Sequence, residues 1–68
     1  MPLPKEVLES LKHDIDEAEE SLKEVKDVVT DMRLAGMDTA KLDSELETLK
    51  DEIRKRRILY DRQKAKSS

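Results

Sequence analysis

The chain has 68 residues, a net charge of −3, 46% charged residues and one aromatic residue, Tyr60. A chain of this length forms one small domain at most, and such domains bury little apolar surface when they fold alone. Its mixture of Leu, Glu, Lys, Asp and Arg is typical of long helices if the apolar residues are periodic, and of disorder if they are scattered. Cys is absent from the sequence, which excludes disulfides, thiolate nucleophiles and Cys-ligated metals.

No apolar run in the sequence has the length of a membrane span or the character of a secretory signal peptide, and the opening Met-Pro-Leu-Pro is not an acylation motif. We therefore expect a cytoplasmic protein without membrane association. Asn is absent, Gln occurs once, and Lys and Glu are abundant. This composition is typical of thermophile proteins and also of idealised designed helices.

The first predicted helix spans residues 4–35. Its apolar residues recur at alternating steps of three and four over four heptads, which predicts an amphipathic helix with one apolar stripe. The stripe consists of Leu8, Leu11, Ile15, Ala18, Leu22, Val25, Val29 and Met32. Pro4 suits the first turn of this helix because the N–H that proline lacks would have no helical partner there.

A tight connection is predicted over residues 36–38. Gly36 is the only glycine of the chain and can adopt the left-handed conformation that closes a helix C-terminus in a Schellman motif, with Met37 next to Met32. Either Asp38 or Thr39 then caps the second helix.

The second predicted helix spans residues 39–64, and its stripe becomes polar towards the end. The stripe positions are Leu42, Leu46, Leu49, Ile53, Arg56 and Tyr60. Residues 65–68 offer no apolar anchor, so we expect this tail to fray. Because a turn this short forces neighbouring helices to run antiparallel, the sequence predicts an all-α fold, a two-helix antiparallel coiled-coil hairpin in a single domain, 1–68.

Folding the chain about its glycine pairs residues whose numbers add up to about 74 or 75. The pairs include Val29 with Leu46, Val25 with Leu49, Leu22 with Ile53, Ala18 with Arg56 and Ile15 with Tyr60. The same register places the acidic stretch 14–20 beside the basic residues 54–60. Residues 5–34 carry ten acidic and five basic side chains, and residues 38–66 carry seven and nine. We expect these charges to favour the antiparallel register more than to add stability.

The apolar stripe of the first helix extends beyond the apolar part of the second, so one end of the hairpin is expected to be open and apolar. We predict that this surface mediates self-association, most simply as a two-fold dimer of hairpins that forms a four-helix bundle. A different protein could dock there instead. The predicted interface residues are Leu3, Val7, Leu8, Leu11, Val28, Ile58, Leu59 and Tyr60.

The sequence offers little for catalysis. His13, the only histidine, lies opposite the apolar stripe between Glu9 and Glu17, and this trio lacks ligands from a second helix. The hydroxyl side chains have no partnered base, and a chain with one glycine contains no phosphate loop. We therefore expect no enzymatic activity, no metal site and no cofactor, and we expect a structural or interaction module.

The alternative function is nucleic-acid association through the basic second helix. Residues 54–66 contain seven positive charges and one negative charge. Against this reading, the chain is acidic overall and contains a single aromatic side chain for stacking on bases. The residues that would contact a polyanion are Arg54, Lys55, Arg57, Arg62, Lys64 and Lys66.

Overall fold

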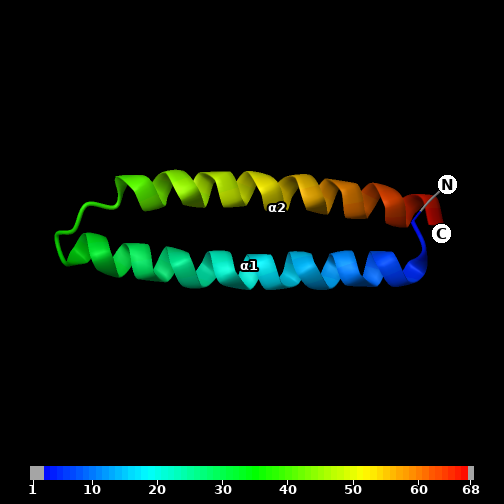
Figure 1. Ribbon diagram of the computed structural model, residues 1–68, viewed down its shortest axis with the longest axis horizontal. Coiled ribbons are helices and arrows are strands. Elements are labelled where there is room, and N and C mark those ends of the chain that lie inside the picture. The colour runs from blue at the N-terminus through cyan, green and yellow to red at the C-terminus, as the bar shows by residue number, and fades with distance from the viewer. Residues whose placement is uncertain (1–2, 68) are drawn as a thin grey trace.

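The computed structural model describes residues 3–67, with the side chains of residues 3–66. It contains two antiparallel helices, α1 (Lys5–Leu34) and α2 (Ala40–Ser67), that pack against each other in a rod of 50 × 15 × 12 Å (Figure 1). No strand occurs between residues 3 and 67. The all-helical class and the packing of two helices are thus confirmed, whereas assembly into a four-helix bundle stays a prediction.

The C-terminus of α1 is closed by the glycine that the sequence singled out. Gly36 has a φ of +82°, its N–H donates to the carbonyl of Arg33 at 2.9 Å, and the N–H of Met37 donates to the carbonyl of Met32 at 2.9 Å. These two bonds are the pair that defines a Schellman motif. They satisfy carbonyls that the end of the helix would otherwise leave without partners, and they turn the chain towards α2.

The start of α2 uses both of the residues that competed for the capping role. Thr39 occupies the position before the first helical residue, and its carbonyl accepts the N–H of Asp43 at 2.8 Å. Asp38 supplies the side-chain acceptor, because its Oδ1 takes the N–H of Ala40 at 3.0 Å. The connection therefore runs over residues 35–39, slightly longer than the predicted 36–38.

Helix α2 continues to Ser67, three residues beyond the predicted end at residue 64. The expected fraying of the tail stays a prediction, and residue 68 lies outside the described part. No Gly or Pro interrupts this stretch, and Lys64 and Lys66 lie in the last turn, where positive charge is favourable beside the exposed carbonyls. The backbone N–H of Leu3 also donates to Gln63 Oε1 at 3.0 Å. In Figure 1 the residues before α1 cross over to the end of α2.

The core of the hairpin is a single line of side chains along the seam between the helices. Its buried apolar residues are Leu8, Ile15, Val29, Leu46 and Ile53. Leu8 is 7% exposed, at the end of the hairpin where α2 continues to Ser67. The prediction that Leu8 belongs to an open apolar end is therefore wrong.

The predicted register is close to the observed one. Ion pairs join Arg33 to Asp43 and Arg57 to Glu19, and the residue numbers of each pair add up to 76. Ile15 and Tyr60, predicted to meet, line one small cavity.

We expect truncation of the core to remove most of the stability of the hairpin. Replacing a buried leucine by alanine costs ~2–5 kcal/mol, whereas the core of a chain this small supplies roughly 3–5 kcal/mol in total. Leu46→Ala should therefore leave the protein largely unfolded at 25 °C, as measured by circular dichroism during urea titration. Leu34→Ala is the matched control, because Leu34 is 83% exposed. Equal losses in the two variants would contradict the assignment of the core.

We expect Gly36→Ala to cost about 1 kcal/mol, because a side chain raises the energy of the left-handed conformation. A Cβ atom added at Gly36 would meet no atom within 4 Å, so backbone strain alone determines the loss. Gly36→Asn should lose less, since Asn tolerates this conformation better than Ala. The free energy of unfolding from urea titration measures both variants, and an unchanged value for Gly36→Ala would contradict the turn geometry.

Candidate functional site

The two edges of the hairpin differ in chemistry, and heptad spacing assigns residues to each. The seam positions are the core residues together with Leu22, Thr39 and Tyr60, which continue the same heptad spacing. Residues four positions after the seam positions lie on one edge, which we call the ion-pair edge. They are Lys12, Glu19, Lys26 and Arg33 on α1 and Asp43, Lys50, Arg57 and Lys64 on α2. Residues one position before or three positions after the seam positions lie on the opposite edge, which we call the apolar edge.

Two contacts between the helices fix the ion-pair edge. Arg57 Nη2 donates to Glu19 Oε1, and Arg33 Nη2 donates to Asp43 Oδ1. The hydrogen bond from Arg57 to Glu19 and the charge of Glu19 raise the pKa of the Arg57 guanidinium above its usual value. Both pairs are largely exposed, and exposed pairs select a register more than they stabilise a fold.

A small polar network near the turn joins the last turn of α1 to the first turn of α2. Arg33 Nε donates to Thr39 Oγ1 at 3.3 Å, and Thr39 Oγ1 donates to Asp43 Oδ2 at 3.1 Å. Thr39 is the one polar residue classed as buried in the described part of the chain. Sequence reasoning missed this network, because the predicted register is one or two residues away from the one that pairs Arg33 with Asp43.

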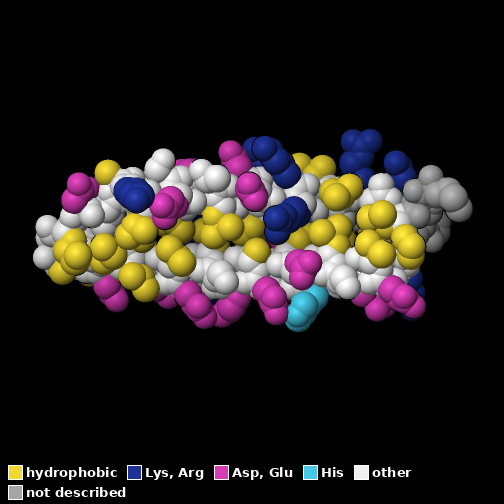
Figure 2. Space-filling model, in the orientation of Figure 1, with side chains coloured by type: hydrophobic (Ala, Val, Ile, Leu, Met, Phe, Trp, Pro, Cys, Tyr) yellow, Lys and Arg dark blue, Asp and Glu magenta, His cyan; other side chains and the backbone are white. Residues whose placement is uncertain are grey.

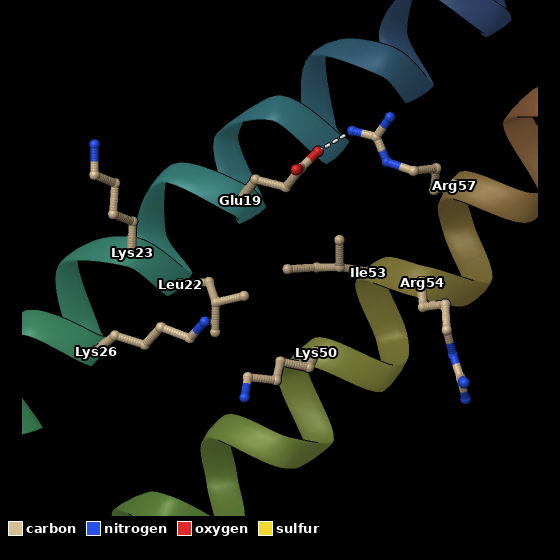
Figure 3. A pocket seen from close by; sticks show the side chains of 8 residues that line it. All are labelled: Glu19, Leu22, Lys23, Lys26, Lys50, Ile53, Arg54 and Arg57. Carbon is tan, nitrogen blue, oxygen red and sulfur yellow. Dashed lines mark hydrogen bonds and ion pairs between the residues drawn. The ribbon is translucent and has the colours of Figure 1, made fainter.

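A shallow groove of about 350 Å³ runs along the middle of the ion-pair edge, beside the Glu19–Arg57 pair (Figure 3). Leu22 and Ile53 form its floor. Figure 3 shows Lys26 and Lys50 reaching into the space between the helices, with Lys23 and Arg54 further out on the two flanks. Sequence reasoning did not find this cluster, because Lys23 and Lys26 belong to the helix whose net charge is negative.

The apolar edge carries several exposed hydrophobic side chains. On the face shown in Figure 2, hydrophobic side chains form a band along the seam between α1 and α2. Val7, Val25 and Val28 on α1 and Leu59 on α2 are exposed residues that the spacing places on this edge. They give this edge an exposed apolar surface that Asp14, Glu45, Glu52 and Arg56 interrupt. Exposed apolar surface of this kind marks interaction sites.

The predicted interface residues are distributed unevenly over the structure. Val7, Val28 and Leu59 lie on the apolar edge, and Ile58 lies next to Leu59 on the outward side of α2. Leu3, Leu11 and Tyr60 are half-buried, and Leu8 is buried within the hairpin. Val25, which the sequence placed in the stripe between the helices opposite Leu49, is 38% exposed and lies on the apolar edge.

The predicted polyanion-binding residues do not form one free basic face. Arg57 is paired with Glu19, and Arg54 Nη2 lies 3.1 Å from Asp51 Oδ1. Lys64 Nζ lies 5.8 Å from the ring centroid of Tyr60. Lys55, Arg62 and Lys66 are exposed on α2, and the neighbouring Arg56 Nη2 lies 3.8 Å from Glu52 Oε2.

His13 lies on the outer face of α1, where its Nε2 is 2.9 Å from Glu17 Oε1. Glu9 is exposed one turn away. Among the described residues, no group of three or more His, Cys, Asp or Glu side chains has the arrangement of a metal site. No helix in the described part of the chain is long and apolar enough to cross a membrane.

Comparison with protein-family models, with curated proteins and with solved structures finds no match for this chain.

We expect the Glu19–Arg57 pair to favour the observed register of α1 against α2. Exchanging the charges of the two residues tests this expectation. Glu19→Arg places like charges opposite each other and should lower the midpoint of thermal unfolding. The double variant Glu19→Arg with Arg57→Glu should recover most of the loss, because it restores opposite charges at the same positions. The recovery should shrink in 1 M salt, where the screening length falls to ~3 Å.

Glu24→Arg is the control for the change in net charge, since Glu24 is exposed on the outer face of α1. If exchanging both charges recovered nothing relative to Glu19→Arg alone, the ion pair would have no part in setting the register.

Proposed function

We propose that this protein is a non-enzymatic interaction module, a helical hairpin that self-associates through its apolar edge and in that form presents its remaining surfaces to a protein partner. The observation that carries the proposal is the imbalance between a thin core and an exposed apolar strip. Five apolar residues are buried in the described part of the chain, while Val7, Val25, Val28 and Leu59 remain exposed beside them.

Apolar burial supports the proposal of association. A core of this size supplies roughly 3–5 kcal/mol to a small chain. Covering the exposed halves of the side chains on the apolar edges of two copies adds on the order of 10 kcal/mol before the costs of association, at ~1.5–3 kcal/mol for each fully buried side chain.

The distribution of charge fits a two-fold dimer. The apolar edge lies opposite the ion-pair edge, so stacking two apolar edges forms a four-helix bundle with charged residues on its outside. Asp14, Glu45, Glu52 and Arg56 lie on the apolar edge itself, among its exposed apolar side chains. These polar positions give the two copies a means of selecting one orientation.

Sedimentation equilibrium or light scattering at micromolar concentration tests the proposal. We expect a particle of twice the 7.9 kDa chain mass. Val28→Glu and Leu59→Glu should each weaken the dimer at least about tenfold, because each buries an unpaired charge in the interface, and tenfold corresponds to ~1.4 kcal/mol.

Leu34→Glu is the matched control, because Leu34 is exposed on the outward side of α1 and should leave the mass unchanged. A well-folded monomer of the unaltered protein at these concentrations would overturn the proposal.

A further inference from the structure

The middle of the ion-pair edge concentrates positive charge in a protein whose net charge is −3. Lys23, Lys26, Lys50 and Arg54 surround the groove over Leu22 and Ile53. The one acid among the groove residues, Glu19, is already paired with Arg57. The groove is therefore a local region of positive potential with an apolar floor.

Lys26 on α1 and Lys50 on α2 face each other across the seam. In the other facing pairs of this edge, the two side chains either carry opposite charges or interact with other residues of their own helix. Glu19 faces Arg57 and Arg33 faces Asp43. At the remaining facing pair, Lys12 and Lys64, Lys12 interacts with Asp16 at 3.4 Å and Lys64 lies over the ring of Tyr60. Because Lys26 and Lys50 repel each other, this pair destabilises the pairing of α1 with α2 that the ion pairs of the same edge favour.

Partners within the chain neutralise only part of the cluster. Lys50 Nζ lies 3.1 Å from Glu47 Oε1, and Arg54 is paired with Asp51. Neither Lys23 nor Lys26 has a side-chain hydrogen bond or ion pair with any residue between positions 3 and 66. An anion placed over Lys26 and Lys50 would neutralise their repulsion and would gain contacts with the flanking Lys23 and Arg54.

We propose that this groove binds an acidic, amphipathic helical segment of a partner protein, laid along the seam as a third helix. Carboxylates of the segment would bridge Lys26 and Lys50, and one or two of its aliphatic side chains would cover Leu22 and Ile53. Helix-in-groove docking uses this combination of an apolar contact line and flanking charges. The groove continues past Lys26 and Lys50 into a second hollow of about 330 Å³ that Val29 and Leu46 also line, which gives a helix a longer apolar line to follow.

The apolar floor favours a peptide over a nucleic acid. A phosphate backbone needs a continuous basic track and gains from aromatic stacking, but this cluster is bounded by Glu47 on one side and by Glu19 on the other. Its lining contains no aromatic side chain among the residues described. The site also lies on the edge opposite the proposed dimer interface, so the two interactions are independent.

The test measures fluorescence anisotropy of a labelled three-heptad peptide with Leu at the core-facing positions and Glu at most of the others. The control peptide carries Gln in place of every Glu, so that it keeps the apolar contact line and loses the charge. We expect the Glu peptide to bind at least about tenfold more tightly than the Gln peptide at low salt. The difference should shrink as salt screens the charges.

Lys26→Glu tests the location without endangering the fold. The introduced carboxylate faces Lys50, so the thermal midpoint should stay the same or rise, while affinity for the Glu peptide should fall at least about tenfold. Lys41→Glu makes the same change in net charge away from the groove and should change affinity less than about twofold. Val28→Glu, on the apolar edge, should also leave peptide affinity close to that of the unaltered protein.

Three results would overturn the proposal. The Gln peptide could bind as tightly as the Glu peptide, which would leave the positive charge without a role. Lys26→Glu could leave peptide affinity unchanged, or Lys41→Glu could reduce it equally. A single-stranded oligonucleotide of similar length could bind more tightly than the Glu peptide with the same sensitivity to Lys26→Glu, which would assign the groove to nucleic acid. None of these readouts depends on the mass of the particle, so they are separate from the test of self-association.

Discussion

The reversal of the chain at Gly36 is the constraint on which the rest of the structure depends. The Schellman bonds at the end of α1 and the network of Arg33, Thr39 and Asp43 hold the two helix ends at a fixed distance and rotation. Once the two helix ends are held in this way, each residue of α1 lies beside one fixed position of α2. The core layers, the ion pairs and the two chemically distinct edges all follow from that single register.

Heptad spacing was sufficient to predict the two helices, their antiparallel arrangement and the residues that line the seam, because apolar steps of three and four specify both the helical period and the buried stripe. Gly36 predicted the position of the turn, because glycine adopts the left-handed backbone conformation at a lower energetic cost than other residues. The C-terminal end of α2 was harder to predict. Its last residues lack apolar anchors, and their helical state depends on the absence of breakers and on the contact of Leu3 with Gln63, which is remote in sequence.

The candidate surfaces were harder to predict than the fold. Val7, Val28 and Leu59 could be identified because they flank the stripe, but the burial of Leu8 required knowing where α2 ends. The basic run 54–66 drew attention in the sequence because its charges are consecutive, yet the structure distributes them around the helix and pairs several with acids. The groove over Leu22 and Ile53 draws lysines from both helices, and only an accurate register brings them together.

The crossover at the open end has a mechanical consequence. Leu3 contacts Gln63, and Figure 1 places the beginning and end of the described chain side by side at one end of the rod. Tension applied to the two ends would therefore pull across the helix axes and peel α1 from α2 one layer at a time, starting at Leu8. Pulled in this way, the layers separate one after another under a small force. A force applied along the helix axes would have to shear every layer at once.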